Sequence, residues 1–225
     1  LKVFELNSEK NEGIPITVDL DTIHITDSFY IDNFSTNFFS DRINGHFYGL
    51  FMGVDPISGS FTSNNGISTV EILSKDAGTF LQVAGLIKKG AEGSLKLSIN
   101  RKQKNIEGRL LTEDLKIYDL PALAKLLQAL SIIGLLEQML GQGLFLDESD
   151  INFRLDGGQY IIDRASFFGP SLGISLDGYF DRKGKLLDFQ GVFSPVYAIN
   201  SIGSVLTRKG EGLIGINFDL WGNPD

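Results

Sequence analysis

Apolar and polar residues alternate along most of this chain, and the alternation predicts β-strands. It is clearest in "GISLDGYF" (173–180), "KLLDFQGVF" (185–193) and "GLIGINFDLWG" (212–222), where every second side chain is apolar. "SLKLSIN" (94–100) and "DINFRLDGG" (150–158) have the same period. Strands of this kind bury one face and expose the other, which is typical of antiparallel sheets.

Short turn signals separate these segments: "SNNG" (63–66), "KKGAEG" (88–93), "DGG" (156–158) and "DRKGK" (181–185). Connections this short join antiparallel neighbours, because parallel strands need long crossovers. We therefore expect a mainly β fold built from successive hairpins. "GHFYGLFMG" (45–53) is apolar on both faces, which predicts a strand covered on both sides or a barrel-like corner.

Residues 119–143 break the alternation and predict a helix that is apolar almost all round. Asp119 is placed to cap its N-terminus, and Gly141 or Gly143 suits its left-handed end. Gly134 offers a point at which it kinks or divides into two shorter helices. We expect one apolar helix or helix pair within 119–141, packed on the apolar face of the sheet.

The same stretch is long enough to span a bilayer, for which about 20 apolar residues suffice. However, Lys125 and Glu137 lie inside it, and its flanks "TEDLKIYD" and "DESD" are acidic. Membrane helices carry Lys and Arg anchors at their ends instead. We therefore expect this helix to cover the sheet and not to cross a membrane.

Composition narrows the classes of partner. The chain has 225 residues, 42% of them hydrophobic and 21% charged, as in globular domains. Its net charge of −8 argues against binding nucleic acid through phosphates or an anionic membrane through a basic patch. The absence of cysteine excludes disulfides and thiolate metal sites. With 26 Gly and 17 Phe, many turns and aromatic strands are expected.

No set of catalytic residues emerges from the sequence. "GPSLG" (169–173) matches the G-x-S-x-G nucleophile elbow, with Ser171 as the nucleophile. A strand pattern follows it where an elbow needs a helix, and both histidines, His24 and His46, precede it in the chain. A hydrolase built on Ser171 is therefore disfavoured, and we expect no enzymatic activity and no cofactor.

Metal binding is also disfavoured. His24 and His46 are far apart in sequence and have no supporting motif, although neighbouring strands would be able to bring them together. "DESD" (147–150) holds three acidic residues, but no calcium-loop pattern follows it, so we interpret it as a solvated turn after the helix.

Four segments carry a resemblance to a known family. They are the helix with its following strand, "LPALAKLLQALSIIGLLEQMLGQGLFLDESDINFRL", then "GPSLGISLDGYFD", "LDFQGVFSPVYAIN" and "GEGLIGINFDLWGNPD". In content and spacing they resemble the C-terminal region of the AsmA-like family, the bacterial envelope proteins related to AsmA and TamB. The resemblance covers residues from about 119 onward, and "SKDAGTFLQVAGL" (74–86) extends it less sharply upstream.

The resemblance implies a long, curved antiparallel sheet folded into a groove with an apolar interior. It implies a protein of the periplasm of Gram-negative bacteria that helps phospholipid pass towards the outer membrane. We then expect three parts: an upstream β-groove segment (1–118), an apolar helical segment (119–142) and a C-terminal β segment (143–225). The chain opens at "LKVFELNSE", so we expect a piece of a longer protein whose N-terminal inner-membrane anchor lies upstream.

On this interpretation one side of the strands faces acyl chains. The predicted lipid-facing residues are Phe153, Leu155, Ile174, Leu176, Phe180, Leu187, Phe189, Phe193, Ile214, Ile216, Phe218 and Leu220. The residues predicted to let the helix plug or shield the groove are Leu123, Leu126, Leu127, Leu130, Ile133 and Leu136.

Other interpretations of the same pattern stay open. The alternating residues would equally fill an ordinary β-core that binds no ligand, because sequence does not separate a filled core from an open groove. A second function is a structural module that binds another envelope protein through its sheet edge and helix. An outer-membrane barrel fits poorly, because its interior would be polar and the apolar helix would have no place.

Overall fold

The computed structural model describes residues 13–40, 42–118, 124–125, 127–128, 141–181, 183–194 and 215–223. Within them, thirteen strands form one large antiparallel sheet that does not close on itself. The prediction of a mainly β fold built on a long curved antiparallel sheet is therefore confirmed.

The strands are long for a globular protein, mostly nine to fourteen residues. Their bounds are β1 (Pro15–His24), β2 (Tyr30–Phe39), β3 (Arg42–Phe51), β4 (Asp55–Asn64), β5 (Ile67–Ser74), β6 (Lys89–Ala91), β7 (Ser94–Lys102), β8 (Asn105–Tyr118), β9 (Leu144–Asp156), β10 (Gln159–Gly169), β11 (Leu172–Asp181), β12 (Leu186–Ser194) and β13 (Ile216–Gly222).

The order of strands in the sheet is their order in the chain, so each strand pairs with its neighbours in sequence. Only β6 departs from this path, because it lies beside the far end of β8, in line with β7. The predicted turns close the hairpins: Asn65 and Gly66 both have positive φ (52° and 76°), as a type I′ turn requires. The predicted turn region 88–93 also contains β6, which the sequence pattern did not show.

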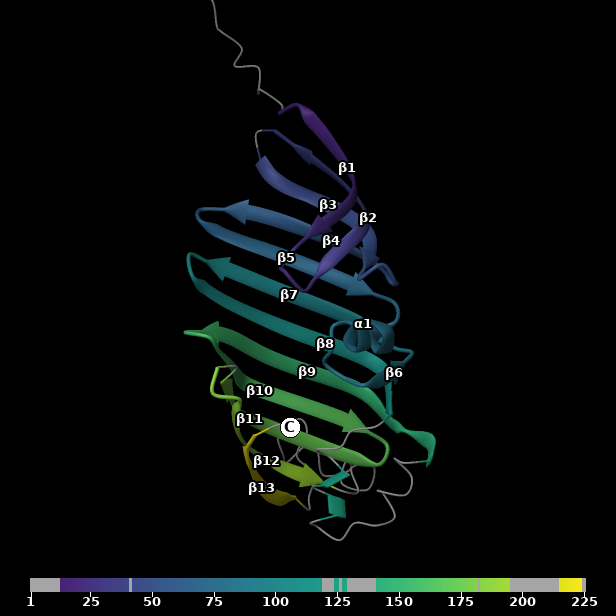
Figure 1. The fold of residues 1–225 in the computed structure, drawn as a ribbon, viewed down its shortest axis with the longest axis vertical. Coiled ribbons are helices and arrows are strands. Elements are labelled where there is room, and N and C mark those ends of the chain that lie inside the picture. Colours follow the sequence, from purple (N-terminus) through teal and green to yellow (C-terminus); the bar gives the residue numbers. More distant parts are fainter. Residues whose placement is uncertain are drawn as a thin grey trace, which may run out of the picture.

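The strands cross the long axis of the molecule and follow one another along it, from β1 at one end to β13 at the other (Figure 1). The sheet curls at its N-terminal end, so that β1 and β2 lie in front of β3 to β5 in this view. Right-handed twist in each long strand, accumulated over the whole path, produces this curl.

One seven-residue helix, α1 (Ala77–Val83), follows β5 and was not predicted from the sequence. Asp76 caps it: its Oδ1 accepts a hydrogen bond from the Thr79 backbone N–H at 2.9 Å, and its Oδ2 accepts one from the Thr79 hydroxyl at 2.7 Å. Gly78 allows the backbone of β6 to approach, because a Cβ at this position would overlap Gly90 and Ala91. The short helix is therefore fixed by its cap and by close backbone packing.

The predicted helix over 119–141 lies mostly outside the described residues. Its Ala124, Lys125, Leu127 and Gln128 are helical, and Leu127 is fully buried in the hydrophobic core. The other predicted covering residues, Leu123, Leu126, Leu130, Ile133 and Leu136, fall outside the described residues. Among the helices that the structure describes, none combines the length and the hydropathy needed to cross a membrane.

The prediction for residues 45–53 was wrong. Phe47 and Phe51 are buried, but Tyr48 between them is 60% exposed, so β3 is covered on one face only. The segment is apolar on both faces because the uncovered face carries an aromatic side chain. Met52 and Gly53, both with positive φ, then turn the chain into β4 as an ordinary hairpin.

Candidate functional site

Cross-strand pairing places the alternating apolar positions on one face of the sheet, here called the inner face. It can be followed as a row of directly paired residues that crosses nine strands. The row consists of Ile57, Ser74, Leu95, Thr112, Ser149, Phe167, Ile174, Phe193 and Ile216. Helix α1 packs on this face. The opposite side of the sheet is called the outer face.

The structure brings the predicted lipid-facing residues together. Eleven of the twelve lie on the inner face in mutually consistent register; Ile214 lies outside the described residues. They differ in accessibility: Phe193 is fully buried and Ile174 is 9% exposed, whereas Leu220 is 38% exposed. The remaining eight are half-buried, namely Phe153, Leu155, Leu176, Phe180, Leu187, Phe189, Ile216 and Phe218.

The inner face has a repeated feature that the sequence did not reveal: a phenylalanine ring lies over a glycine on the neighbouring strand. In each case the two residues are direct cross-strand partners, and a Cβ on the glycine would overlap the ring. The pairs are Phe47 with Gly59, Phe61 with Gly45, Phe153 with Gly108, Phe189 with Gly178 and Phe218 with Gly191. Each ring uses the space that its partner leaves, so it covers backbone while projecting less from the sheet.

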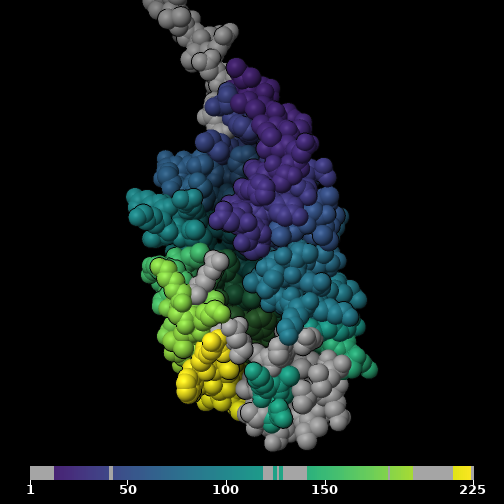
Figure 2. Space-filling view, in the orientation of Figure 1, coloured from purple at the N-terminus to yellow at the C-terminus, as the bar shows by residue number. Residues whose placement is uncertain are grey.

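The two ends of the strands are covered differently. At the end near α1, inner-face residues such as Phe51, Leu95 and Leu115 are no more than 6% exposed. At the other end, Ile43 is 61% exposed and Leu220 is 38% exposed. Figure 2 shows this face hollowed in its middle, with a floor in the green of β9 and β10. The inner face is therefore closed along one margin and accessible along the other.

Helix α1 covers the closed margin of the inner face. It is joined to the sheet by an aromatic contact and by a series of hydrogen-bonded polar groups. Asp55, at the start of β4, is 1% exposed and bonds to the Ser74 side chain, whose hydroxyl accepts a hydrogen bond from the Asp76 backbone N–H at 3.0 Å. Burial raises the pKa of the Asp55 carboxyl. The hydrogen bond with Ser74 lowers this pKa, and the nearby negative charge of Asp76 raises it. Its Oδ2 has no hydrogen-bond partner among the described residues.

Besides Ser74, two further buried hydroxyls interrupt the apolar row next to this point. Thr112 and Ser149 are direct cross-strand partners, 3% and 2% exposed, and neither hydroxyl has a hydrogen-bond partner in the described part of the chain. The alternation of β8 changes just beyond them. Asp114, with φ of 54°, shifts the alternation of β8, so that Thr112 and Leu115 both face inward.

The outer face carries many charged side chains and is crossed by ion pairs. Lys96 bonds to Glu71 at 2.9 Å and lowers the pKa of that carboxyl; Asp150 bonds to Arg109 at 2.8 Å and raises the pKa of that guanidinium. The interpretation of residues 147–150 as a solvated turn was wrong, because they lie within β9. Glu148 and Asp150 of this run lie on the outer face of β9, and the cation for Asp150 comes from 41 residues away.

The residues considered for catalysis are not assembled into a site. Ser171 lies in the turn between β10 and β11, and a strand follows it, so the strand–turn–helix context of a nucleophile elbow is missing. His24 packs against Tyr30, with ring centroids 5.8 Å apart, whereas His46 is level with Thr17 on β1, seven residues from His24. Among the described residues, no group of three side chains is arranged to bind a metal ion.

Comparison with known proteins returns no match: no family model, no curated protein and no solved structure is similar to this chain. The AsmA-like resemblance of residues 119–225 therefore stays a prediction. What the arrangement itself offers is a long apolar face, accessible along one margin, with few polar groups to act chemically.

Proposed function

We propose that this protein binds phospholipid on its inner face and conducts it along the sheet, without catalysing a reaction. The observation that carries the proposal is the continuity of the inner face. The row through Ile174 and Phe193 runs from β4 to β13 without a charged residue, and its apolar side chains are interrupted only by the hydroxyl groups of Ser74, Thr112 and Ser149. Acyl chains would be held by hydrophobic contact alone, and headgroups would stay outside.

The length of the face favours conduction over storage of a single molecule. Twelve strands follow one another in the sheet, and neighbouring strands lie about 4.8 Å apart, so the face extends about 50 Å along the sheet. The hydrocarbon of one lipid leaflet is about 15 Å thick, half of a bilayer core. Several acyl chains would therefore fit in succession.

The free energy of hydration favours an apolar occupant of the hollow. Each Å² of apolar surface removed from water stabilises a complex by about 25 cal/mol. Half-buried rings such as Phe153, Phe189 and Phe218 retain surface that acyl chains would cover. The Phe–Gly pairs add to this, because flattened rings leave more space above the sheet.

The resemblance to the AsmA-like family supports the setting of this function. It favours the periplasm, an inner-membrane anchor in the full-length protein, and transfer of phospholipid between the inner and outer membranes. Each of these is part of the proposal, together with the expectation that nucleic acid is not a partner, which the net charge of −8 supports.

The first experiment is lipid extraction and mass spectrometry of the chain, exported to the periplasm of a Gram-negative host and purified without detergent. We expect phospholipid in stoichiometric amounts. Protein that is folded, monomeric and free of lipid would contradict the proposal and would favour a core filled by its own side chains.

Variants on the two faces sharpen this test. Leu176→Asp together with Leu220→Asp places charges on the accessible part of the inner face and should remove the lipid. Leu73→Asp, on the outer face at a position 46% exposed, is the matched control and should keep it. Circular dichroism establishes that each variant is folded. Equal lipid content in both variants would contradict the proposal.

Photo-crosslinking tests the same point without adding charge. Benzoylphenylalanine at Phe153 or Phe189 should crosslink to phospholipid in the exporting cells, because both rings lie on the inner face. The same probe at Tyr48, exposed on the outer face of β3, should not. Crosslinks to a protein from the inner-face positions would instead indicate that this face is a protein interface.

A second candidate function is docking of another envelope protein by strand addition. It is favoured by the two ends of the described sheet, where β1 and β13 each pair on one side only. Crosslinks from Thr17 or Asn217 to one envelope protein, with lipid absent, would support this function over lipid binding.

A further inference from the structure

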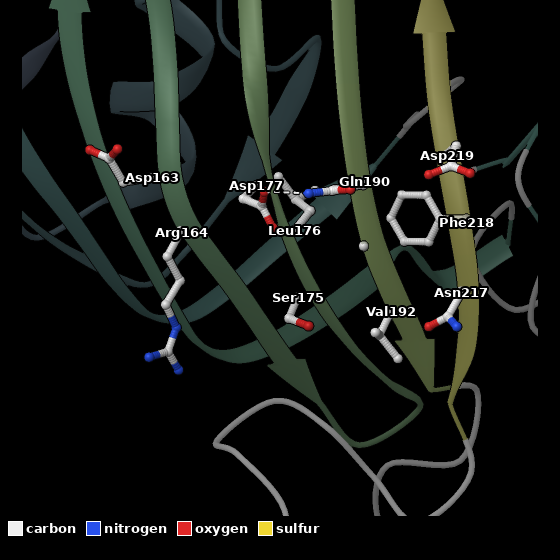
Figure 3. Close-up of a pocket in the computed structure, with 11 residues that line it drawn as sticks. Asp163, Arg164, Ser175, Leu176, Asp177, Gln190, Val192, Asn217, Phe218 and Asp219 are labelled. Atoms are coloured by element: carbon white, nitrogen blue, oxygen red, sulfur yellow. Dashed lines mark hydrogen bonds between the residues drawn. The ribbon is translucent and has the colours of Figure 1, made fainter.

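The outer face has a hollow of its own at the C-terminal end of the sheet. Two adjoining depressions, of about 450 and about 310 Å³, share Asp163 and Asp177 in their linings. Figure 3 shows the larger one, with Asp163 and Arg164 on one side and Asn217 and Asp219 on the other. Most of its lining residues, among them Asp177, Gln190, Asn217 and Asp219, stand on the outer face, so lipid binding does not account for them; Leu176, Gly191 and Phe218 of the lining belong to the inner face.

A β-bulge in β10 produces the irregularity. Ile162 pairs with Gly178 and Ala165 pairs with Leu176, so Asp163 and Arg164 together stand opposite Asp177. The extra residue bends the strand and re-aims the two side chains. Asp163 is held in place by Arg154, whose Nε donates to Oδ1 at 2.9 Å.

The adjoining strands add a regular array of hydrogen-bonding groups. Asp177, Gln190 and Asp219 form one row across β11, β12 and β13, and Gln190 Nε2 donates to Asp177 Oδ2 at 2.9 Å. Ser175 and Asn217 stand in the next row. Rows on one face are about 7 Å apart and neighbouring strands about 4.8 Å apart, which are the dimensions of a sugar ring and its substituents.

The charge of the hollow selects against ionic ligands. Its combined lining holds three carboxylates, on Asp163, Asp177 and Asp219, and two guanidinium groups, on Arg154 and Arg164. Two of the carboxylates already accept hydrogen bonds, from Arg154 and from Gln190. A nearly balanced lining of planar carboxylate, amide and guanidinium groups suits a neutral ligand with many hydroxyls, each of which both donates and accepts.

An aromatic side chain stands beside this array. Trp221 is 79% exposed and lies on the outer face of β13, two residues from Asp219. Among the described residues the side chains of Trp221, Asp219 and Asn217 make no hydrogen bond or ion pair. An exposed indole offers a flat apolar surface with a polar edge, on which the C–H face of a sugar ring can stack.

We propose that this outer-face hollow binds a neutral saccharide, with Trp221 as the stacking surface and Gln190, Asn217 and Asp219 as hydrogen-bonding groups. Asp163 and Arg164 form the far wall. The proposal does not rest on lipid binding, because Trp221, Gln190, Asn217 and Asp219 stand on the side of the sheet opposite to the lipid-facing side chains.

The test is calorimetric titration of the full chain with three neutral hexasaccharides: maltohexaose, cellohexaose and chitohexaose. At least one is expected to bind with a Kd of roughly 1 mM or tighter, which corresponds to about 4 kcal/mol. Trp221→Ala and Asp219→Ala should each weaken it about tenfold. Asp19→Asn, an exposed outer-face position on β1 at the other end of the sheet, is the matched control and should bind as the wild type does.

Spermidine serves as the cationic probe. Binding of spermidine but of none of the three hexasaccharides would overturn the proposal in favour of a cation site. Absence of binding by all four probes would overturn it as well, and so would saccharide binding that Trp221→Ala and Asp219→Ala leave unchanged. Unfolding curves of the variants exclude loss of the fold as the cause of weaker binding.

Discussion

The ring of Phe80 on α1 stacks on the ring of Phe51 at the end of β3, with centroids 4.5 Å apart and planes within 19°. The two residues are the point at which the short helix joins the inner face. A seven-residue helix is too short to be stable by itself, so this contact and the Asp76 cap hold it in place.

Phe80→Ala should therefore lower the free energy of unfolding by about 3–5 kcal/mol, the usual cost of deleting a buried phenylalanine ring. Phe80 is only 5% exposed. Leu86→Ala, at a side chain 67% exposed just after α1, is the control and should change stability by no more than about 0.5 kcal/mol. Urea unfolding followed by circular dichroism measures both, and equal effects would show that α1 is not anchored through this ring.

Gly108→Ala should destabilise the sheet by about 1–3 kcal/mol, because the new methyl group overlaps the ring of Phe153. The cost should shrink when Phe153→Leu is present as well, and a double-mutant cycle measures this coupling. Gly141→Ala, where a Cβ meets nothing within 4 Å, is the control and should be neutral or slightly stabilising. Additive effects of Gly108→Ala and Phe153→Leu would contradict the pairing.

Asp55→Asn should stabilise the protein more at pH 7 than at pH 4. The pKa of Asp55 is raised above its ordinary value near 3.8, so the folded state holds this proton more tightly than the unfolded state. The contribution of the Asp55 carboxyl to the free energy of unfolding is therefore most favourable below about pH 3.8. It is lost as the pH rises through the pKa of this group in the folded state. Unfolding free energies at both pH values test this, with Asp19→Asn on exposed β1 as control, and a pH-independent effect would be contrary to it.

Arg109→Gln should cost less than about 1 kcal/mol despite its two hydrogen bonds to Asp150, at 2.9 and 2.8 Å. The Arg109 side chain is 52% exposed, so water and salt screen the pair. Any loss should decrease further in 1 M salt. A loss of several kcal/mol in unfolding experiments would mean that the outer-face ion pairs align the strands.

The strands and their inward residues were predictable because burial of one face imposes a period of two on each strand. Phe189, Gln190 and Gly191 show this directly: the first and third face inward and the second outward. Helix α1 was missed because seven residues hold too few turns to display a helical period, although the Asp76 and Thr79 spacing is a capping signal.

Features that depend on the register between strands could not be predicted from the sequence. Phe153 and Gly108 are 45 positions apart, and nothing near either residue specifies the other. The bulge at Asp163 is likewise defined only by the pairing of β10 with both of its neighbours. Asp150 in a strand was mistaken for part of a turn because local composition outweighed a partner 41 residues away.

Because the strands follow one another in chain order, the length of the inner face can change without a change in the rest of the sheet. Since each strand along the path pairs only with its sequence neighbours, a hairpin inserted at a turn such as Asn65–Gly66 would lengthen the sheet by about 10 Å and leave every other pairing intact. A closed or interleaved sheet would have to be rebuilt to accept the same insertion. Such a scaffold can change its span in steps of one hairpin, to match whatever distance it has to cover.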